Sequence, residues 1–329
     1  MSIDAVPAED RARLIVRRLL AMKPGEQVAL VCDPSSERVM VDALCHQILE
    51  AGAEFTVLTQ PDRDTDRKNE LTPTIQKGLE AADVVIGLTR SGGAPTYHHA
   101  VKKLYKAKTL RGMSMVMRTL ENYTSGGALA DYDALKAEGE ELAALWRSGS
   151  RIRVTTPAGT DLTAIIAGED VIVECGFATE PGLEAAFSDG EVSQMPTEGT
   201  AQGTIVVDGP VAHLGGGEPI RLRIEEGRVA AVESEGPRSD ALRDIIRRVP
   251  RADNIAEIGI GLNGACRRNG DFEEEKKARG LVHIAIGDNV FYGGTVHCSV
   301  HMDMVQYAPT IRIDEHVVVD AGEVVFDRR

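Results

Sequence analysis

The sequence predicts an α/β protein in two parts, an N-terminal three-layer α/β domain with a parallel sheet and a C-terminal β-rich α+β domain that binds metal. Three observations predict this. Short apolar runs alternate with helix-like segments over the first 149 residues. The pattern then changes to short alternating strands separated by turn residues. Histidines and carboxylates recur inside apolar strands between residues 255 and 304.

The N-terminal part begins with an amphipathic helix. Over Ala8–Met22, apolar residues recur at steps of three and four, and Lys23-Pro24-Gly25 ends the helix. Apolar runs that alternate with periodic stretches follow, and this order predicts a parallel sheet covered by helices. We expect strands at Gln27–Cys32, Glu54–Thr59, Ala82–Thr89 and Arg111–Met117, and helices at Arg38–Ala51, Thr72–Ala81 and Thr96–Ala107.

A long helix predicted over Tyr132–Arg147 closes this part, so we place a domain boundary near residue 149 and expect domains at 1–149 and 150–329. Beyond the boundary, Gly, Pro and Asp turns separate segments typical of antiparallel hairpins. We expect these strands at Arg151–Thr156, Asp161–Ala167, Gly203–Val207, Ile220–Glu226 and Arg228–Glu233, and one helix at Ser239–Val249.

The composition is that of an ordinary globular protein with an acidic charge balance. Of the 329 residues, 43% are hydrophobic and 27% charged, with a mean hydropathy of −0.15. These values argue against a disordered or fibrous chain. The 37 Lys and Arg stand against 51 Asp and Glu, a net charge of −14. This balance weighs against nucleic-acid binding, which relies on clustered Lys and Arg.

Targeting and redox features predict a cytoplasmic protein with no membrane partner. No run approaches the ~18 apolar residues of a membrane span, and the N-terminus lacks the uncharged apolar core of a signal peptide. The five cysteines form an odd set without a CxxC pair, so we expect reduced thiols.

Two turns of the N-terminal part are placed where open α/β sheets bind ligands, beyond the C-terminal ends of strands. Cys32-Asp33-Pro34-Ser35-Ser36 lacks the glycines of a dinucleotide-binding turn, so a dinucleotide is not expected. The turn Thr89-Arg90-Ser91-Gly92-Gly93 carries a guanidinium suited to hold a substrate carboxylate bidentately. A solvated loop arginine is an equal alternative for Arg90.

The strongest chemistry lies in three later strands. The strand Ile255–Asn263 contains one carboxylate, Glu257, which needs a cationic partner because a buried unpaired charge is costly. The strand Leu281–Gly287 contains His283. His301 and Asp303 stand two apart, so in an extended segment their side chains share a face.

Two imidazoles and two carboxylates on apolar strands predict a site for a divalent transition metal: Zn, Fe, Co or Mn. Each residue also has a structural explanation when it is taken singly, since a core histidine is usually hydrogen-bonded and Asp303 could cap a turn. Four such residues within one short stretch favour the metal site.

Four motifs in order resemble a known family: MPTE at 195–198, AEIGIGLN at 256–263, VHIAIG at 282–287 and HMD at 301–303. They resemble the aminopeptidase T family of metallopeptidases, in which these positions hold a cluster of divalent metals. The resemblance implies as metal ligands Glu198, Glu257, His283, His301 and Asp303. It gives Glu198 a role as a further ligand or as the general base. Val290 stands at the spacing of a family tyrosine, and Tyr292 is its nearest stand-in.

Other segments resemble 2,5-dihydroxypyridine 5,6-dioxygenases, ring-cleaving non-haem iron enzymes of the same ancestry. These are the run VECGFATEPG at 173–182, the strand GTIVVDG at 203–209 and the end of the chain. The resemblance implies iron held by two His and one Asp. His301 and Asp303 match two of these ligands, but the remaining His position aligns with Glu257. Two further histidines of the dioxygenases align near Arg90 and Ala186.

These features predict a metal-dependent, aminopeptidase-like hydrolase, in which a metal-activated water attacks an amide or related C–N bond of a small molecule or short peptide. Arg90, from the other domain, would anchor an acidic substrate group across the cleft. Two alternatives stay open: an iron(II) dioxygenase that cleaves a hydroxylated pyridine or similar aromatic, and a non-catalytic, metal-stabilised binding protein. Because relatives assemble as oligomers, the resemblance also implies a homo-oligomer.

Overall fold

The computed structural model describes residues 7–62, 70–90, 95–116 and 119–326. Contacts divide the chain into two units, each built from two stretches. Unit 1 comprises Met1–Leu129 and Cys175–Asp189, and unit 2 comprises Ala130–Glu174 and Gly190–Arg329. The single boundary near residue 149 stays a prediction.

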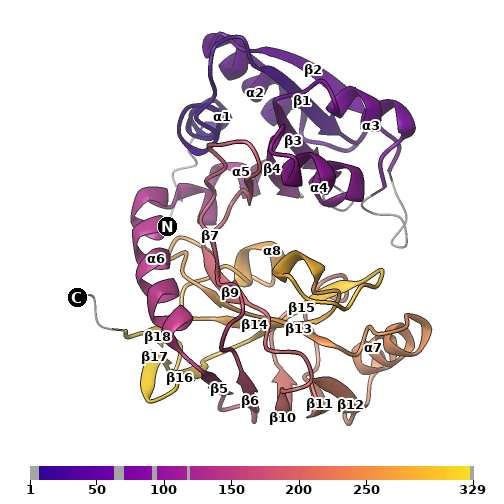
Figure 1. Cartoon of the computed structure of the whole chain (residues 1–329), viewed down its shortest axis with the longest axis vertical. Coiled ribbons are helices and arrows are strands. Elements are labelled where there is room, and N and C mark those ends of the chain that lie inside the picture. The colour runs from indigo at the N-terminus through magenta and orange to yellow at the C-terminus, as the bar shows by residue number, and fades with distance from the viewer. Residues whose placement is uncertain (1–6, 63–69, 91–94, 117–118, 327–329) are drawn as a thin grey trace. The chain divides into compact units, whose positions relative to one another are not determined.

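Unit 1 contains a five-stranded parallel sheet in the order β2-β1-β3-β4-β8 (Figure 1). Four of these strands confirm the alternating pattern of the sequence. The fifth, β8, comes from the second stretch of the unit and was not expected. The strands are β1 (Gln27–Cys32), β2 (Glu54–Thr59), β3 (Val84–Thr89), β4 (Arg111–Val116) and β8 (Glu184–Ala186).

Helices cover both faces of this sheet, which gives the expected three layers (Figure 1). Right-handed crossovers in this strand order place α2 on one face and α3 and α4 on the other. Ala29 and Val31 of β1 pack in one buried cluster with side chains of α3 and α4. The helical segments are α1 (Ala8–Leu14), continued by the π-helical η1 (Ile15–Leu19), α2 (Arg38–Glu50), α3 (Pro73–Leu79), η3 (Pro95–Tyr97), α4 (His99–Lys106), α5 (Leu120–Thr124) and η4 (Gly126–Leu129).

Unit 2 contains two antiparallel sheets, as its hairpin-like pattern predicted. The eight-stranded sheet has the order β12-β11-β10-β6-β5-β16-β17-β18. Its strands are β5 (Arg151–Thr155), β6 (Asp161–Ile165), β10 (Gln202–Val207), β11 (Ile220–Glu225), β12 (Arg228–Val232), β16 (Thr310–Ile313), β17 (His316–Asp320) and β18 (Glu323–Val324). Along β11, buried and exposed residues alternate, so one face of this sheet packs on the core and the other faces solvent.

The second sheet of unit 2 has the order β15-β14-β13-β9-β7. Its strands are β7 (Ile172–Glu174), β9 (Glu191–Gln194), β13 (Ile255–Gly261), β14 (Val282–Gly287) and β15 (His301–Gln306). The helical segments of unit 2 are α6 (Tyr132–Ser148), α7 (Pro237–Arg248), α8 (Phe272–Glu275) and η5 (Val290–Tyr292). Every residue of β13 and β14 is buried. Polar side chains on these two strands are therefore withdrawn from water.

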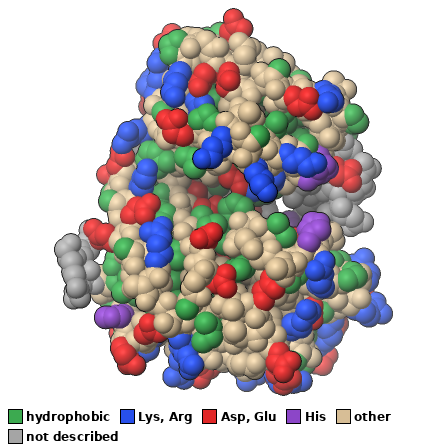
Figure 2. Space-filling model, in the orientation of Figure 1, with side chains coloured by type: hydrophobic (Ala, Val, Ile, Leu, Met, Phe, Trp, Pro, Cys, Tyr) green, Lys and Arg blue, Asp and Glu red, His purple; other side chains and the backbone are tan. Residues whose placement is uncertain are grey.

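The surface carries charges of both signs. Figure 2 shows acidic and basic side chains interspersed over the face in view. All five cysteines are free, as expected for reduced thiols. No helix in the described part of the chain combines the length and the apolar run needed to cross a bilayer.

Candidate metal centre

The register of three neighbouring strands brings the predicted residues together. Glu257 on β13 lies opposite Ala285 on β14, and Ala285 lies opposite Asp303 on β15. His301 stands two residues before Asp303 on the same strand, so both side chains share a face. His283 on β14 lies opposite Gly259 on β13.

Gly259 makes room for the imidazole of His283. A β-carbon at this position would clash with both Nε2 and Cε1 of His283. The missing side chain therefore allows the histidine ring to lie across β13 and to reach Glu257.

Glu257 is the centre of the cluster. Its Oε1 lies 3.0 Å from Nε2 of His283, and its Oε2 lies 2.8 Å from Nε2 of His301. Nε2 of His301 is also 3.2 Å from Oδ1 of Asp303. The structure thus brings together all four residues singled out on the strands.

Among the described residues, two groups of potential ligand atoms share Glu257. The outer group is Glu257, His301 and Asp303, and the inner group is Glu191, Glu257 and His283; within each group the atoms lie within 4.8 Å of one another. The side chain of His301 is 35% exposed, whereas that of His283 is completely buried. Only the outer group therefore has a ligand that solvent reaches.

Two buried oxygens of these groups have no hydrogen-bond partner among the described residues. They are Oδ1 of Asp303 and Oε2 of Glu191. Such orphaned acceptors are costly in a protein interior, and a bound cation would satisfy them. Imidazole and carboxylate donors suit Zn, Fe, Co or Mn, so the residues present fit a divalent transition metal.

The second nitrogen of each histidine is occupied. Nδ1 of His283 lies 3.1 Å from the carbonyl oxygen of Lys276, and Nδ1 of His301 lies 2.7 Å from that of Asp288. A carbonyl can only accept, so each Nδ1 carries a proton. Each Nε2 faces an oxygen of Glu257 and donates to it while the ring is protonated, and loss of that second proton would free Nε2 to bind a metal. Metal-binding histidines are typically oriented in this way.

Two lysines balance part of the negative charge. Nζ of Lys276 lies 3.2 Å from Oδ2 of Asp303, and Nζ of Lys277 lies 2.7 Å from Oε1 of Glu191. Burial by itself would raise the pKa of Asp303, but Lys276 and the histidines hold that pKa well below its usual range. Burial and the charge of Asp303 would likewise raise the pKa of Glu257, yet hydrogen bonds with His283 and His301 lower it. Both carboxyl groups are therefore ionised at neutral pH.

Glu198 lies outside both groups. Its Oε1 accepts hydrogen bonds from Asn289 Nδ2 at 2.9 Å and the Thr295 amide at 2.6 Å, and its Oε2 accepts one from Thr295 Oγ1 at 2.6 Å. These bonds hold the loop that carries Tyr292. The role of Glu198 as ligand or base stays a prediction.

Tyr292 lies beside the outer group. Its ring stacks on that of His301 with centroids 6.4 Å apart, and its hydroxyl lies 3.0 Å from Ser193 Oγ. Burial raises the pKa of Tyr292 well above its ordinary value, so the phenol keeps its proton.

Arg90 belongs to unit 1, where it follows β3. Its backbone amide donates to Oδ2 of Asp33 at 2.8 Å, and its Nη1 lies 3.6 Å from Oε1 of Glu37. The turn of Arg90 thus meets the turn after β1, where the strand order reverses. Residues 91–94 of this turn lie outside the described residues, and the anchoring role of Arg90 stays a prediction.

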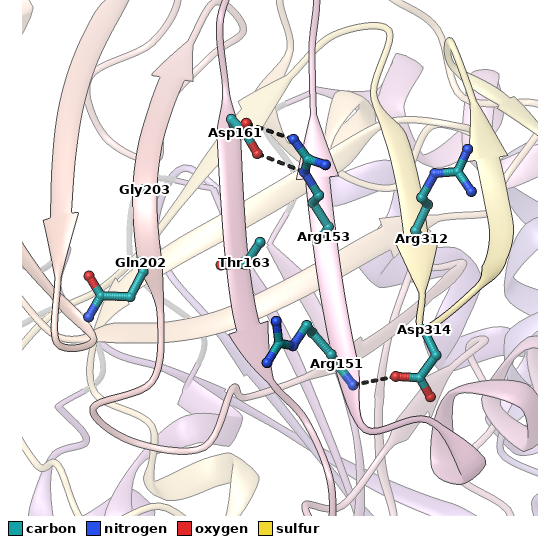
Figure 3. Close-up of a pocket in the computed structure, with 8 residues that line it drawn as sticks. All are labelled: Arg151, Arg153, Asp161, Thr163, Gln202, Gly203, Arg312 and Asp314. Atoms are coloured by element: carbon teal, nitrogen blue, oxygen red, sulfur yellow. Dashed lines mark hydrogen bonds and ion pairs between the residues drawn. The ribbon is translucent and has the colours of Figure 1, made fainter.

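A separate groove of about 560 Å³ lies on the eight-stranded sheet (Figure 3). Its side chains come from β5, β6, β10 and β16 and include Arg151, Arg153 and Arg312. No residue of the metal cluster lines it. The groove is therefore separate from the candidate metal centre.

Sequence reasoning missed three residues of the centre. Glu191 stands in a short strand that had no strong pattern, and β9 reaches the cluster only because it pairs with β13. Lys276 and Lys277 stand in the run EEEKKARG, which has the appearance of a solvated charged segment. A carboxylate inside the buried stretch EVSQM was the one available signal for Glu191.

Comparisons with known proteins agree on one family. The family model described as NicX, 2,5-dihydroxypyridine 5,6-dioxygenase, matches residues 15–326. A curated 2,5-dihydroxypyridine 5,6-dioxygenase of Pseudomonas putida is 28% identical over 197 residues, which cover 55% of this chain and 56% of that protein. The match therefore spans little more than half the length of this relative.

Two solved structures have a similar fold over nearly the whole chain. The structure of 2,5-dihydroxypyridine dioxygenase from Pseudomonas putida KT2440 has a TM-score of 0.82 at 22% identity and covers 97% of this chain and 96% of its own. Wild-type AmpT from Thermus thermophilus has a TM-score of 0.68 at 17% identity and covers 97% and 99%. The resemblance to aminopeptidase T is thus a likeness of fold.

The expectation of an aminopeptidase-like hydrolase was wrong. The family model that spans the chain is that of 2,5-dihydroxypyridine 5,6-dioxygenases, and this match overturns the metallopeptidase reading. The physical reason for the error is that carboxylate and imidazole ligands serve both chemistries. A carboxylate such as Glu257 among the candidate ligands does not by itself specify the reaction.

Proposed function

Because the chain belongs to the NicX 2,5-dihydroxypyridine 5,6-dioxygenase family, we propose that it is an iron(II)-dependent dioxygenase that cleaves the ring of a hydroxylated pyridine or a closely related aromatic. The observation that carries this proposal is the family match over residues 15–326, which includes every residue of the cluster. The name of the curated relative supports the same reaction class.

The outer group would hold the iron, through Nε2 of His301, Oδ1 of Asp303 and a carboxylate oxygen of Glu257. Exposure of His301 supports this choice, since oxygen and an aromatic substrate must reach the ion. Bound iron would supply the one-electron chemistry that lets dioxygen react with a closed-shell ring. The group has one imidazole and two carboxylates, so it differs at Glu257 from a set of two histidines and one carboxylate.

Neighbouring side chains would hold these ligands in place. The carbonyl of Asp288 fixes the tautomer of His301, and the ring of Tyr292 limits its rotation. Lys276 keeps Asp303 ionised and leaves its Oδ1 turned to the cluster. The neutral phenol of Tyr292 can donate a hydrogen bond but is a poor base.

Oxygen consumption tests the proposal. Protein purified without oxygen and loaded with iron(II) is mixed with 2,5-dihydroxypyridine or related hydroxypyridines, and oxygen uptake and loss of ring absorbance are followed. We expect one O2 consumed per ring opened and, with 18O2, both labelled atoms in the product. His301→Ala should abolish turnover. His316→Ala, an exposed histidine of β17, is the matched control and should retain it.

Two results contradict the proposal. One is ring opening at an undiminished rate under nitrogen, because the second substrate would then be water. The other is the absence of oxygen uptake with every hydroxylated aromatic of the panel, although the protein holds iron and is folded.

A further inference from the structure

We infer that Lys277, together with Lys276, acts as a built-in cation that restricts the centre to one divalent ion. The inference deepens the proposed function, since it concerns the same cluster and rests on its being a metal site. It does not depend on which reaction the bound ion performs.

Without the lysines, the cluster would have the features of a two-metal site. The inner group and the outer group each offer three ligand residues, and they share Glu257. Its two oxygens point to different histidines, Oε1 to His283 and Oε2 to His301. A carboxylate that offers one oxygen to each side is suited to bridge two ions, which in such sites stand about 3.5–4 Å apart.

The ammonium group of Lys277 already neutralises Glu191 of the inner group. Its Nζ lies 2.7 Å from Oε1 of Glu191, and the two side chains are only 4% and 2% exposed. The other oxygen of Glu191 accepts no hydrogen bond from any described residue and lies 3.5 Å from Nε2 of His283. Glu191 is therefore held between a lysine and a histidine.

The charges in direct contact favour one ion over two. Three carboxylates, Glu191, Glu257 and Asp303, face two ammonium groups, so the cluster with neutral imidazoles carries one net negative charge. One divalent ion would leave a net charge of about +1, and a second ion would leave about +3 in a buried site. Replacing Lys277 by a neutral side chain removes the positive charge nearest to the inner group.

The backbone holds Lys277 in place. The amide of Asn263 donates to its carbonyl oxygen at 3.0 Å. A β-carbon on Gly261 would lie 2.7 Å from the carbonyl carbon of Lys277 and 2.8 Å from its carbonyl oxygen, so the main chain of Lys277 packs directly on β13. These contacts fix the main chain from which the side chain of Lys277 extends to Glu191.

The test counts bound ions in four proteins: wild type, Lys277→Met, Lys277→Arg, and the double variant Lys277→Met with Glu191→Gln. Each is stripped of metal and titrated with Zn²⁺ or Mn²⁺ in a calorimeter, and its metal content is then measured after gel filtration. We expect about one ion per chain in the wild type and in Lys277→Arg, which keeps the charge. Lys277→Met should bind about two. The double variant loses one charge of each sign and should return to about one.

A single substitution of Glu191, the ion-pair partner of Lys277, keeps the inference testable if Lys277→Met does not fold. Glu191→Gln leaves Lys277 uncompensated beside the cluster, so the affinity for the first ion should fall about tenfold to a hundredfold. Circular dichroism checks that each variant is folded.

The inference is overturned if folded Lys277→Met still binds a single ion at saturating metal, if the wild type binds two, or if Glu191→Gln binds its first ion as tightly as the wild type. None of these results depends on oxygen uptake. A protein that binds one ion but consumes no oxygen would contradict the proposed function and leave this inference standing.

Discussion

At the scale of single residues, Gly259 decides whether His283 can reach the cluster. Gly259→Ala should push the imidazole away from Glu257, weaken metal binding and cost about 1–3 kcal/mol of stability through overpacking. Thermal unfolding and metal titration measure both effects. Gly264→Ala is the matched control, because a β-carbon there meets only Arg279 at an ordinary 3.8 Å. Wild-type metal affinity in Gly259→Ala would contradict this role.

Glu257 carries the charge that both ligand groups share. Glu257→Gln keeps the shape of the side chain but removes its charge. Substitution of a residue that only hydrogen-bonds a metal ligand lowers metal affinity about tenfold to a hundredfold, and loss of a ligand's charge should lower it further. Glu315→Gln, at an exposed carboxylate of the same unit, should bind metal normally. Glu257→His would rebuild two histidines and one carboxylate with His301 and Asp303, and it should retain iron. Full metal content in Glu257→Gln would make Glu257 a structural carboxylate.

At the scale of elements, one ion pair links the start of β1 to the start of β4 in unit 1. The guanidinium of Arg111, 1% exposed, donates to both oxygens of Glu26 at 2.8 and 2.7 Å and also to the carbonyl of Leu20. Burial would raise the pKa of Glu26, but the hydrogen bonds from Arg111 lower it below its ordinary 4.5.

The pH dependence of this pair follows from the direction of the shift. A carboxyl whose pKa is lower in the folded state stabilises fully above its unfolded pKa, and this contribution is lost as the pH falls from about 4.5 through the folded value. Glu26→Gln should remove this dependence and cost about 3 kcal/mol at neutral pH, because it leaves Arg111 buried and unpaired. Urea unfolding from pH 3 to pH 7 measures both effects.

The control for this experiment is Glu80→Gln, at a surface ion pair with Lys77 in which both side chains are more than half exposed. Exposed pairs of this kind contribute little, so its stability should match that of the wild type across the same pH range. Equal losses of stability in Glu26→Gln and Glu80→Gln would show that the burial of Arg111 does not strengthen its ion pair.

At the scale of the whole molecule, all potential ligands belong to unit 2. Metal binding should therefore slow amide hydrogen exchange in β13, β14 and β15 and leave the sheet of unit 1 unchanged. An ion at a hundred times its Kd would add about 2.7 kcal/mol to the opening free energy of the strands that hold it. Exchange followed by mass spectrometry with and without Zn²⁺ measures this, with Glu257→Gln as the control. Equal protection of β1 and β3 would contradict the assignment of binding to unit 2.

The sequence by itself determined the class of the fold. Alternating apolar and periodic segments predicted four strands and the helices of unit 1, because burial of one helix face and of both sheet faces leaves a local pattern in the chain. The strand β8 escaped prediction, since three residues carry too little pattern and α6, β5, β6 and β7 lie between it and its partner β4 in the chain. The sequence does not reveal the division of the chain into units for the same reason: Cys175–Asp189 belongs to unit 1 through contacts with residues far away in the chain.

The sequence also predicted which strands bring the candidate ligands together, since a carboxylate and histidines inside apolar runs demand a partner. Only the tertiary structure decided how they combine. The order of β9 and β13 adds Glu191 to the cluster, and the close approach of the main chain at Gly261 adds Lys277. Both contacts join residues far apart in the chain, where spacing gives no signal. The charge balance and the burial of the candidate site depend on these contacts, because both are properties of the packed site.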